Sequence, residues 1–130
     1  MPFPIKERLI EETEKKIGAR FPDSFRRKMM IENGGEVDAA SDTWNLHPFF
    51  DTSDKKHLGR TCNHILRETE VSKKWLGFPP NGLNLADNGT GNHLVFLISG
   101  DKVDPEVYLW NHETGELTLV VNDFSELCPN

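Results

Sequence analysis

The chain has 130 residues, of which 36% are hydrophobic, and a formal net charge of −6 at pH 7. A chain of this length can bury a hydrophobic core without disulfides, which predicts one globular domain over residues 1–130 and argues against disorder. The negative charge argues against nucleic-acid binding, which needs clustered positive charge, and no apolar run approaches the roughly 18 residues of a membrane helix.

Helical spacing of apolar residues predicts a helix near residues 6–17 that ends at Gly18. A second helix is predicted near 22–33, because Pro22 is favoured in a first turn and a glycine pair follows Asn33. One of Gly34 and Gly35 should therefore have a positive φ.

A third helix is predicted near residues 57–73, with Asp54 as its N-terminal cap and Leu58 and Cys62 on its apolar stripe. Cys62 is accordingly expected in the core. The segment Trp75–Pro80 is expected to end this helix and to pack over the core.

Period-two alternation and turn residues predict five strands, near residues 36–46, 83–87, 93–98, 107–112 and 116–121. An Asn-Gly turn joins the second strand to the third, and a hairpin around residues 113–115 joins the last two. A short helix is predicted to start near Asn122 or Asp123. The order predicts an α+β fold: N-terminal helices, then a mainly antiparallel sheet with a middle helix and a short C-terminal helix.

Several short motifs occur in a fixed order along the chain: Ile17-Gly18, Pro22-Asp23, Asn33-Gly34-Gly35, Trp44 before Leu46-His47-Pro48, and a glycine-rich turn into the strand Gly91–Leu97. In that order, the chain from about Leu9 to Leu127 resembles the Smi–Knr family of the SUKH superfamily. The resemblance implies helices followed by a mostly antiparallel sheet and a terminal helix. It also implies a protein-binding role without enzyme activity: in bacteria largely immunity proteins that neutralise a cognate toxin, and in fungi regulatory adaptors.

Candidate catalytic and metal-binding patterns are weak. The glycine-rich turn at residues 87–92 has no lysine and precedes a strand, which is typical of a hairpin and not of a phosphate loop. His57 and His64 lie two turns apart on the predicted helix, too far to share one zinc ion, and Cys62 and His64 point to different faces. We therefore expect no enzyme activity, cofactor or metal, and a hydrolase or metal enzyme remains as an alternative.

The first residues lack the pattern of a signal peptide, so we expect a cytoplasmic protein in which Cys62 and Cys128 are free thiols. The alternative for this pair is a disulfide.

The acidic residues are concentrated in two segments. Residues 36–54 carry five acids and no base, and residues 76–130 carry eight acids and one base, Lys102. Such a field favours a cationic protein partner, such as a nuclease toxin, although acids in loops also serve solubility. The candidate partner-binding residues are Asp38, Asp42, Asp51, Asp54, Asp87, Asp101, Asp104, Glu106 and Trp110.

Two details of this set are specific expectations. Asp51 and Asp54 are expected to be exposed, so that replacing them by lysine leaves stability nearly unchanged. Tyr108 and Trp110 share one face of their strand, opposite Val107 and Leu109. Either this aromatic pair forms an exposed aromatic–acidic surface or it points into the core; the alternation alone leaves both open.

Overall fold

The computed structural model describes residues 2–129, and only the backbone of Cys128 and Pro129. It is an α+β domain, as predicted. The helices are α1 (Glu7–Ile17), α2 (Asp23–Ile31), α3 (Lys55–Arg60), α4 (Ile65–Ser72) and the 3-10 helix η1 (Phe124–Glu126). Among the described residues, no helix is both long and apolar enough to cross a bilayer.

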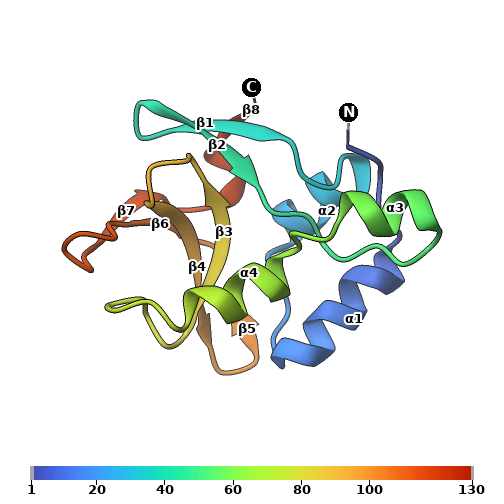
Figure 1. Ribbon diagram of the computed structural model, residues 1–130, viewed down its shortest axis with the longest axis horizontal. Coiled ribbons are helices and arrows are strands. Elements are labelled where there is room, and N and C mark those ends of the chain that lie inside the picture. The colour runs from blue at the N-terminus through green and yellow to red at the C-terminus, as the bar shows by residue number, and fades with distance from the viewer. Residues whose placement is uncertain (1, 130) are drawn as a thin grey trace.

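The strands are β1 (Glu36–Ala39), β2 (Asp42–Leu46), β3 (Gly82–Asp87), β4 (His93–Ser99), β5 (Lys102–Val103), β6 (Val107–Trp110), β7 (Leu117–Val121) and β8 (Cys128–Pro129). They form one sheet in the order β7-β6-β4-β3-β2-β1-β8, with β5 paired to β4. Every one of these pairs is antiparallel. Helices α1, α2 and α3 gather at one end of the sheet, and α4 lies across β3 (Figure 1).

The main core lies between one face of the sheet and the N-terminal helices. Phe25 of α2 is fully buried and contacts Phe96 of β4 and Phe124 of η1 edge to face. Alternation along β1 and β2 buries Val37 and Trp44 on this side and leaves their neighbours on the opposite face. We call that opposite side the outer face of the sheet.

A second, smaller core forms on the outer face. It contains Phe78, Val95 and Trp110, with Tyr108 packed against it. The predicted packing of the Trp75–Pro80 segment over core residues is confirmed, because Phe78 belongs to this cluster. Trp110 is therefore buried in this smaller core, whereas Val107 is buried in the main core. The two alternatives were an exposed aromatic–acidic surface and a pair that points into the core, and neither describes this arrangement fully.

The predicted glycine corner after α2 is confirmed at both positions. Gly34 has φ of 120° and Gly35 has φ of 88°, values that side chains with a Cβ rarely adopt. This corner carries the chain from the end of α2 into β1, so it places Glu36 at the start of the sheet.

The single strand predicted over residues 36–46 is wrong, because the chain reverses within it. Ala40 and Ser41 have φ of 49° and 62° and connect β1 to β2 as a two-residue hairpin. Turns with two positive φ values usually contain Asn or Gly. Ala-Ser carries no such signal, which is why the alternation by itself predicts one strand.

The single helix predicted over residues 57–73 is also wrong. It is two helices, α3 and α4, separated by residues 61–64. The Thr61 hydroxyl donates to the His57 carbonyl and accepts from the Asp51 backbone N–H, while the His64 ring caps α4 by accepting from the Arg67 N–H. These local bonds replace the helical ones and end α3 after Arg60.

The break in the helix removes the predicted apolar stripe. Cys62 is exposed instead of lying in the core, and Leu58 is 40% exposed. The free thiol predicted at Cys62 is confirmed, while the side chain of Cys128 lies outside the described residues.

The short strands β5 and β8 were not predicted, since two-residue strands leave no periodic pattern.

Candidate functional site

One row of residues crosses the outer face of the sheet. Cross-strand partners project from the same face, so the pairing register of β1, β2, β3, β4, β6 and β7 aligns six side chains. In spatial order the row is Glu36, Asn45, Asp87, His93, Trp110 and Leu117. The row is acidic at its β1–β3 end and aromatic to aliphatic at its β4–β7 end.

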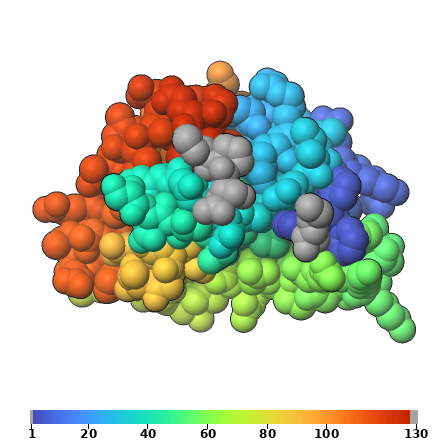
Figure 2. All heavy atoms as spheres, turned by 90° about the horizontal axis from the view of Figure 1, so that it is seen from above, coloured from blue at the N-terminus to red at the C-terminus, as the bar shows by residue number. Residues whose placement is uncertain are grey.

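The acidic end of this row and the tip of the β1–β2 hairpin form what we call the acidic patch. It consists of Glu36, Asp38 and Asp87, which project from the outer face, and Asp42, which pairs with Ala39 at the hairpin tip. Glu36, Asp38 and Asp42 are exposed, and the Asp87 side chain is 38% exposed. An Asn88 amide donates to Asp42 Oδ2 at 2.7 Å, which ties the β1–β2 hairpin to the β3–β4 turn. From above, the hairpin lies between the C-terminal strands and the N-terminal helices (Figure 2). Four carboxylates are therefore held on neighbouring strands.

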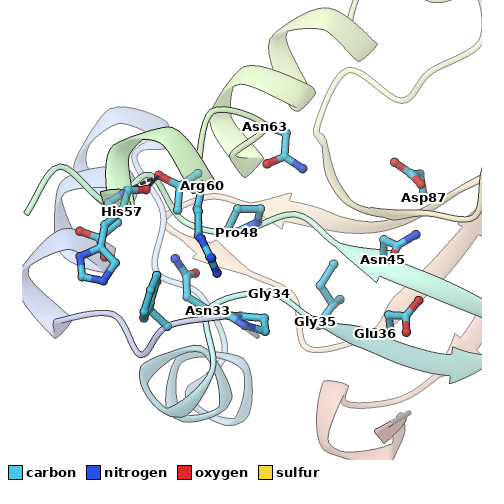
Figure 3. A pocket seen from close by; sticks show the side chains of 15 residues that line it. Asn33, Gly34, Gly35, Glu36, Asn45, Pro48, His57, Arg60, Asn63 and Asp87 are labelled. Carbon is cyan, nitrogen blue, oxygen red and sulfur yellow. Dashed lines mark hydrogen bonds between the residues drawn. The ribbon is translucent and has the colours of Figure 1, made fainter. Parts of the chain in front are cut away.

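A cleft of about 530 Å³ adjoins the acidic patch (Figure 3). Glu36, Asn45 and Asp87 line one side of the cleft, and Arg60 and His57 of α3 line the other. The Arg60 guanidinium lies 5.0 Å from the centre of the Phe3 ring, so the N-terminal segment closes this end. The cleft offers opposite charges at its two ends, which suits a polar, charged segment of a partner.

The aliphatic and aromatic end forms what we call the apolar patch, consisting of Trp75, Leu76, Tyr108, Leu117 and Leu119. Leu76 is 96% exposed, and Leu119 is 50% exposed. Trp75 stacks on the buried Trp110 with ring centroids 5.9 Å apart. The Trp75–Leu76 loop approaches the β6–β7 hairpin where Gly77 meets Gly115, so loop and strand form one continuous surface.

A buried polar cluster lies between the two patches. Asn84 Oδ1 is 3.1 Å from His47 Nε2 and 3.0 Å from His93 Nδ1, and Asn84 Nδ2 donates to Ser72 Oγ at 2.8 Å. A carbonyl oxygen only accepts, so each imidazole donates one ring N–H to it. Burial lowers the pKa of both histidines, against the attraction of Asp87. The cluster thus connects α4 to β3, to β4 and to His47, the residue after β2.

The structure brings together only part of the predicted contact set. Asp38, Asp42 and Asp87 meet in the acidic patch. Asp101, Asp104 and Glu106 are also exposed or half-buried, but they lie in the connections around β5, which Figure 1 shows on the opposite side of the molecule from the β1–β2 hairpin. The Asp101 carbonyl accepts from the Arg20 N–H and the Asp104 carboxylate from the Ser99 hydroxyl.

Three predicted contact residues have structural roles instead. Asp51 is 3% exposed and accepts two bonds from Ser53, so the expectation that it is exposed is wrong. Asp54 caps α3 by accepting from the His57 N–H at 2.8 Å, and this bond lowers its pKa. Trp110 is 1% exposed and donates to the Gly77 carbonyl. Trp110 therefore supports the apolar patch from below and is not itself an exposed anchor.

Sequence reasoning missed Leu76, Leu117 and Leu119, and it counted Glu36 only toward the charge of its segment. A signal for Glu36 exists, because it shares the period-two face of Asp38. The exposed leucines carry no comparable signal, since alternation does not tell which face of an edge strand is covered.

The geometry of the outer face offers surfaces for binding. Within residues 2–127, no three histidine, cysteine, aspartate or glutamate side chains approach one another closely enough to hold a metal ion. The outer face and the adjoining hairpin therefore carry two surfaces of contrasting chemistry, one acidic and one apolar.

A model of the SMI1 / KNR4 family (SUKH-1) matches residues 4–129, nearly the whole chain. The protein therefore belongs to the SMI1 / KNR4 family. No match was found among curated proteins, and none among solved structures.

Proposed function

We propose that this protein is a non-enzymatic immunity protein that binds and neutralises a cognate bacterial toxin, with a cationic nuclease as the favoured kind of toxin. The observation that supports the proposal is the acidic patch, in which Glu36, Asp38, Asp42 and Asp87 project from three neighbouring strands beside a cleft. Membership of the SMI1 / KNR4 family is consistent with this role.

The physical reason for a cationic partner is the local field. Carboxylates spaced along adjacent strands sum their potentials over the same surface, and a nuclease carries clustered Lys and Arg because it must hold phosphates. The same carboxylates imitate that phosphate charge, so blocking the nucleic-acid site is the natural mode of inhibition. The cleft beside the patch would receive a side chain or loop from the toxin.

The experiment is a search of the neighbouring genes for a toxin domain, followed by co-expression of this protein with any such domain. The wild-type protein should restore growth and co-purify with that domain. The triple variant Asp38→Lys, Asp42→Lys, Asp87→Lys should lose both effects, whereas Glu11→Lys, Glu12→Lys on the exposed side of α1 should keep them. If the triple variant still protected the cells fully from the toxin, the acidic patch would not be the binding surface.

The runner-up function is a regulatory or scaffold adaptor in signalling or cell-envelope synthesis. It would use the same carboxylates, so the identity of the captured partner separates the two: a kinase or a cell-wall enzyme, in place of a toxin, favours the adaptor.

A further inference from the structure

The apolar patch has no role in the proposed contact with a cationic toxin. Its exposed members include Leu76, which is 96% exposed, and Leu117 and Leu119, which are 37% and 50% exposed. Leu117 and Leu119 lie on β7, the strand at the end of the sheet order. The five residues Leu117–Val121 include no charge. Edge strands usually carry charges or a cover that prevents association, so this edge favours contact with another chain.

The borders of the patch carry opposite charges. Lys74, Trp75 and Leu76 form one wall of the patch, and His112 belongs to the opposite wall. Glu113 follows His112 in the sequence, and its side chain is 79% exposed. A hollow of about 570 Å³ lies between these walls, lined also by His93 and Trp110. A surface with a cation on one border and an anion on the other is complementary to itself when it is rotated by a half turn.

We propose that the apolar patch binds a second copy of this chain, forming a two-fold symmetric dimer. In this dimer Leu76, Leu117 and Leu119 of both copies are buried together, and Lys74 of each copy faces Glu113 of the other. A second copy satisfies both border charges, because its Glu113 meets Lys74 and its Lys74 meets Glu113, whereas a purely cationic partner meets only Glu113 favourably. The inference does not depend on the proposed function, and it leaves the acidic patch available to another partner.

The first test is the mass of the purified protein as a function of concentration, by sedimentation equilibrium. The wild-type protein should move from 14.8 kDa toward twice that mass as concentration rises. Leu119→Glu should raise the dissociation constant by about tenfold or more, because it buries a carboxylate in the apolar centre. Leu76→Glu serves as a second variant on a side chain with almost no contacts to lose, so that folding is unaffected.

The matched control is Leu58→Glu, which introduces the same change at a 40% exposed leucine on α3, away from the patch. It should dimerise like the wild-type protein. A chain that stays at 14.8 kDa up to about millimolar concentration overturns the proposal. So does a dimer that both patch variants leave unchanged.

The second test exchanges the border charges. Lys74→Glu alone and Glu113→Lys alone should each weaken dimerisation several-fold, because each leaves like charges facing one another. The double variant should recover most of the wild-type affinity, since the exchanged pair is again opposite in charge. Double-variant losses equal to the sum of the single losses would overturn the assigned two-fold arrangement.

Discussion

Gly34 and Gly35 hold the corner between α2 and β1 with φ values of 120° and 88°. We expect Gly34→Ala to lower the free energy of unfolding by about 1 kcal/mol or more, because a Cβ is strained in this region. Urea unfolding measures the change. Gly59 inside α3 is the control: it has no positive φ, and no atom lies within 4 Å of the position that a Cβ would take, so Gly59→Ala should stabilise by about 0.5–1 kcal/mol. Equal effects at both sites would contradict the argument.

The buried histidines make stability depend on pH. The pKa values of His47 and His93 are lowered by burial from their ordinary value of 6.5, so the unfolded chain binds more protons than the folded one in the window below that value. Their contribution is therefore present above about pH 6.5 and is lost as pH falls toward the lowered pKa. His64, whose pKa burial also lowers, acts in the same direction.

The expected outcome is that the free energy of unfolding decreases between about pH 7.5 and 5.5, and that His47→Gln decreases less over the same range. Urea unfolding at each pH gives the values. Parallel curves for wild type and His47→Gln would show that another group titrates.

At the scale of the element, α3 is a short helix that depends on its cap. Asp54 accepts from the His57 N–H, and Asp51 holds the preceding turn through Ser53. Asp54→Ala should therefore lower the midpoint of thermal unfolding, and Asp54→Asn should lower it less, because an amide oxygen still caps. Thermal unfolding by circular dichroism measures both. An unchanged midpoint for Asp54→Ala would mean that α3 forms without its cap.

The elements that were predicted correctly have strong local signals. Helices α1 and α2 and strands β3, β4, β6 and β7 lie within a few residues of their predicted bounds because periodicity and glycine turns mark them. The β1–β2 turn at Ala40-Ser41 and the break at residues 61–64 were missed. At these two positions the conformation is set by pairing across strands and by Thr61 and His64 side chains, which a local pattern does not contain.

At the scale of the molecule, the acidic patch should govern the rate of partner association. Asp38→Lys with Asp42→Lys should slow association several-fold at low salt, and the difference should shrink at high salt as the charges are screened. Surface plasmon resonance with the immobilised toxin domain measures the rates. The Glu11→Lys, Glu12→Lys variant is the control. Rates that respond to neither salt nor Asp38 and Asp42 would leave these acids as solubility features.

The candidate site could be predicted only in part. A sequence shows which residues are acidic, but it does not show where their side chains lie on the folded surface. The two acidic segments include Asp38, Asp42 and Asp87, which the fold brings to one surface. The same reasoning also included Asp51, which the fold buries, and Asp101, which directly precedes β5, a strand on another side of the molecule from the β1–β2 hairpin. Only the strand order decides which acids share a face.

The alternation of residues along β1 and β2 has a consequence for divergence between relatives. Along β1 and β2, one set of alternate residues fills the main core, and the other set faces outward. Substitutions in the outward set can change charge and shape without creating a cavity in the core. A new binding specificity can therefore arise by point mutation at little risk to folding, and each lineage can follow a changing partner while its scaffold stays constant.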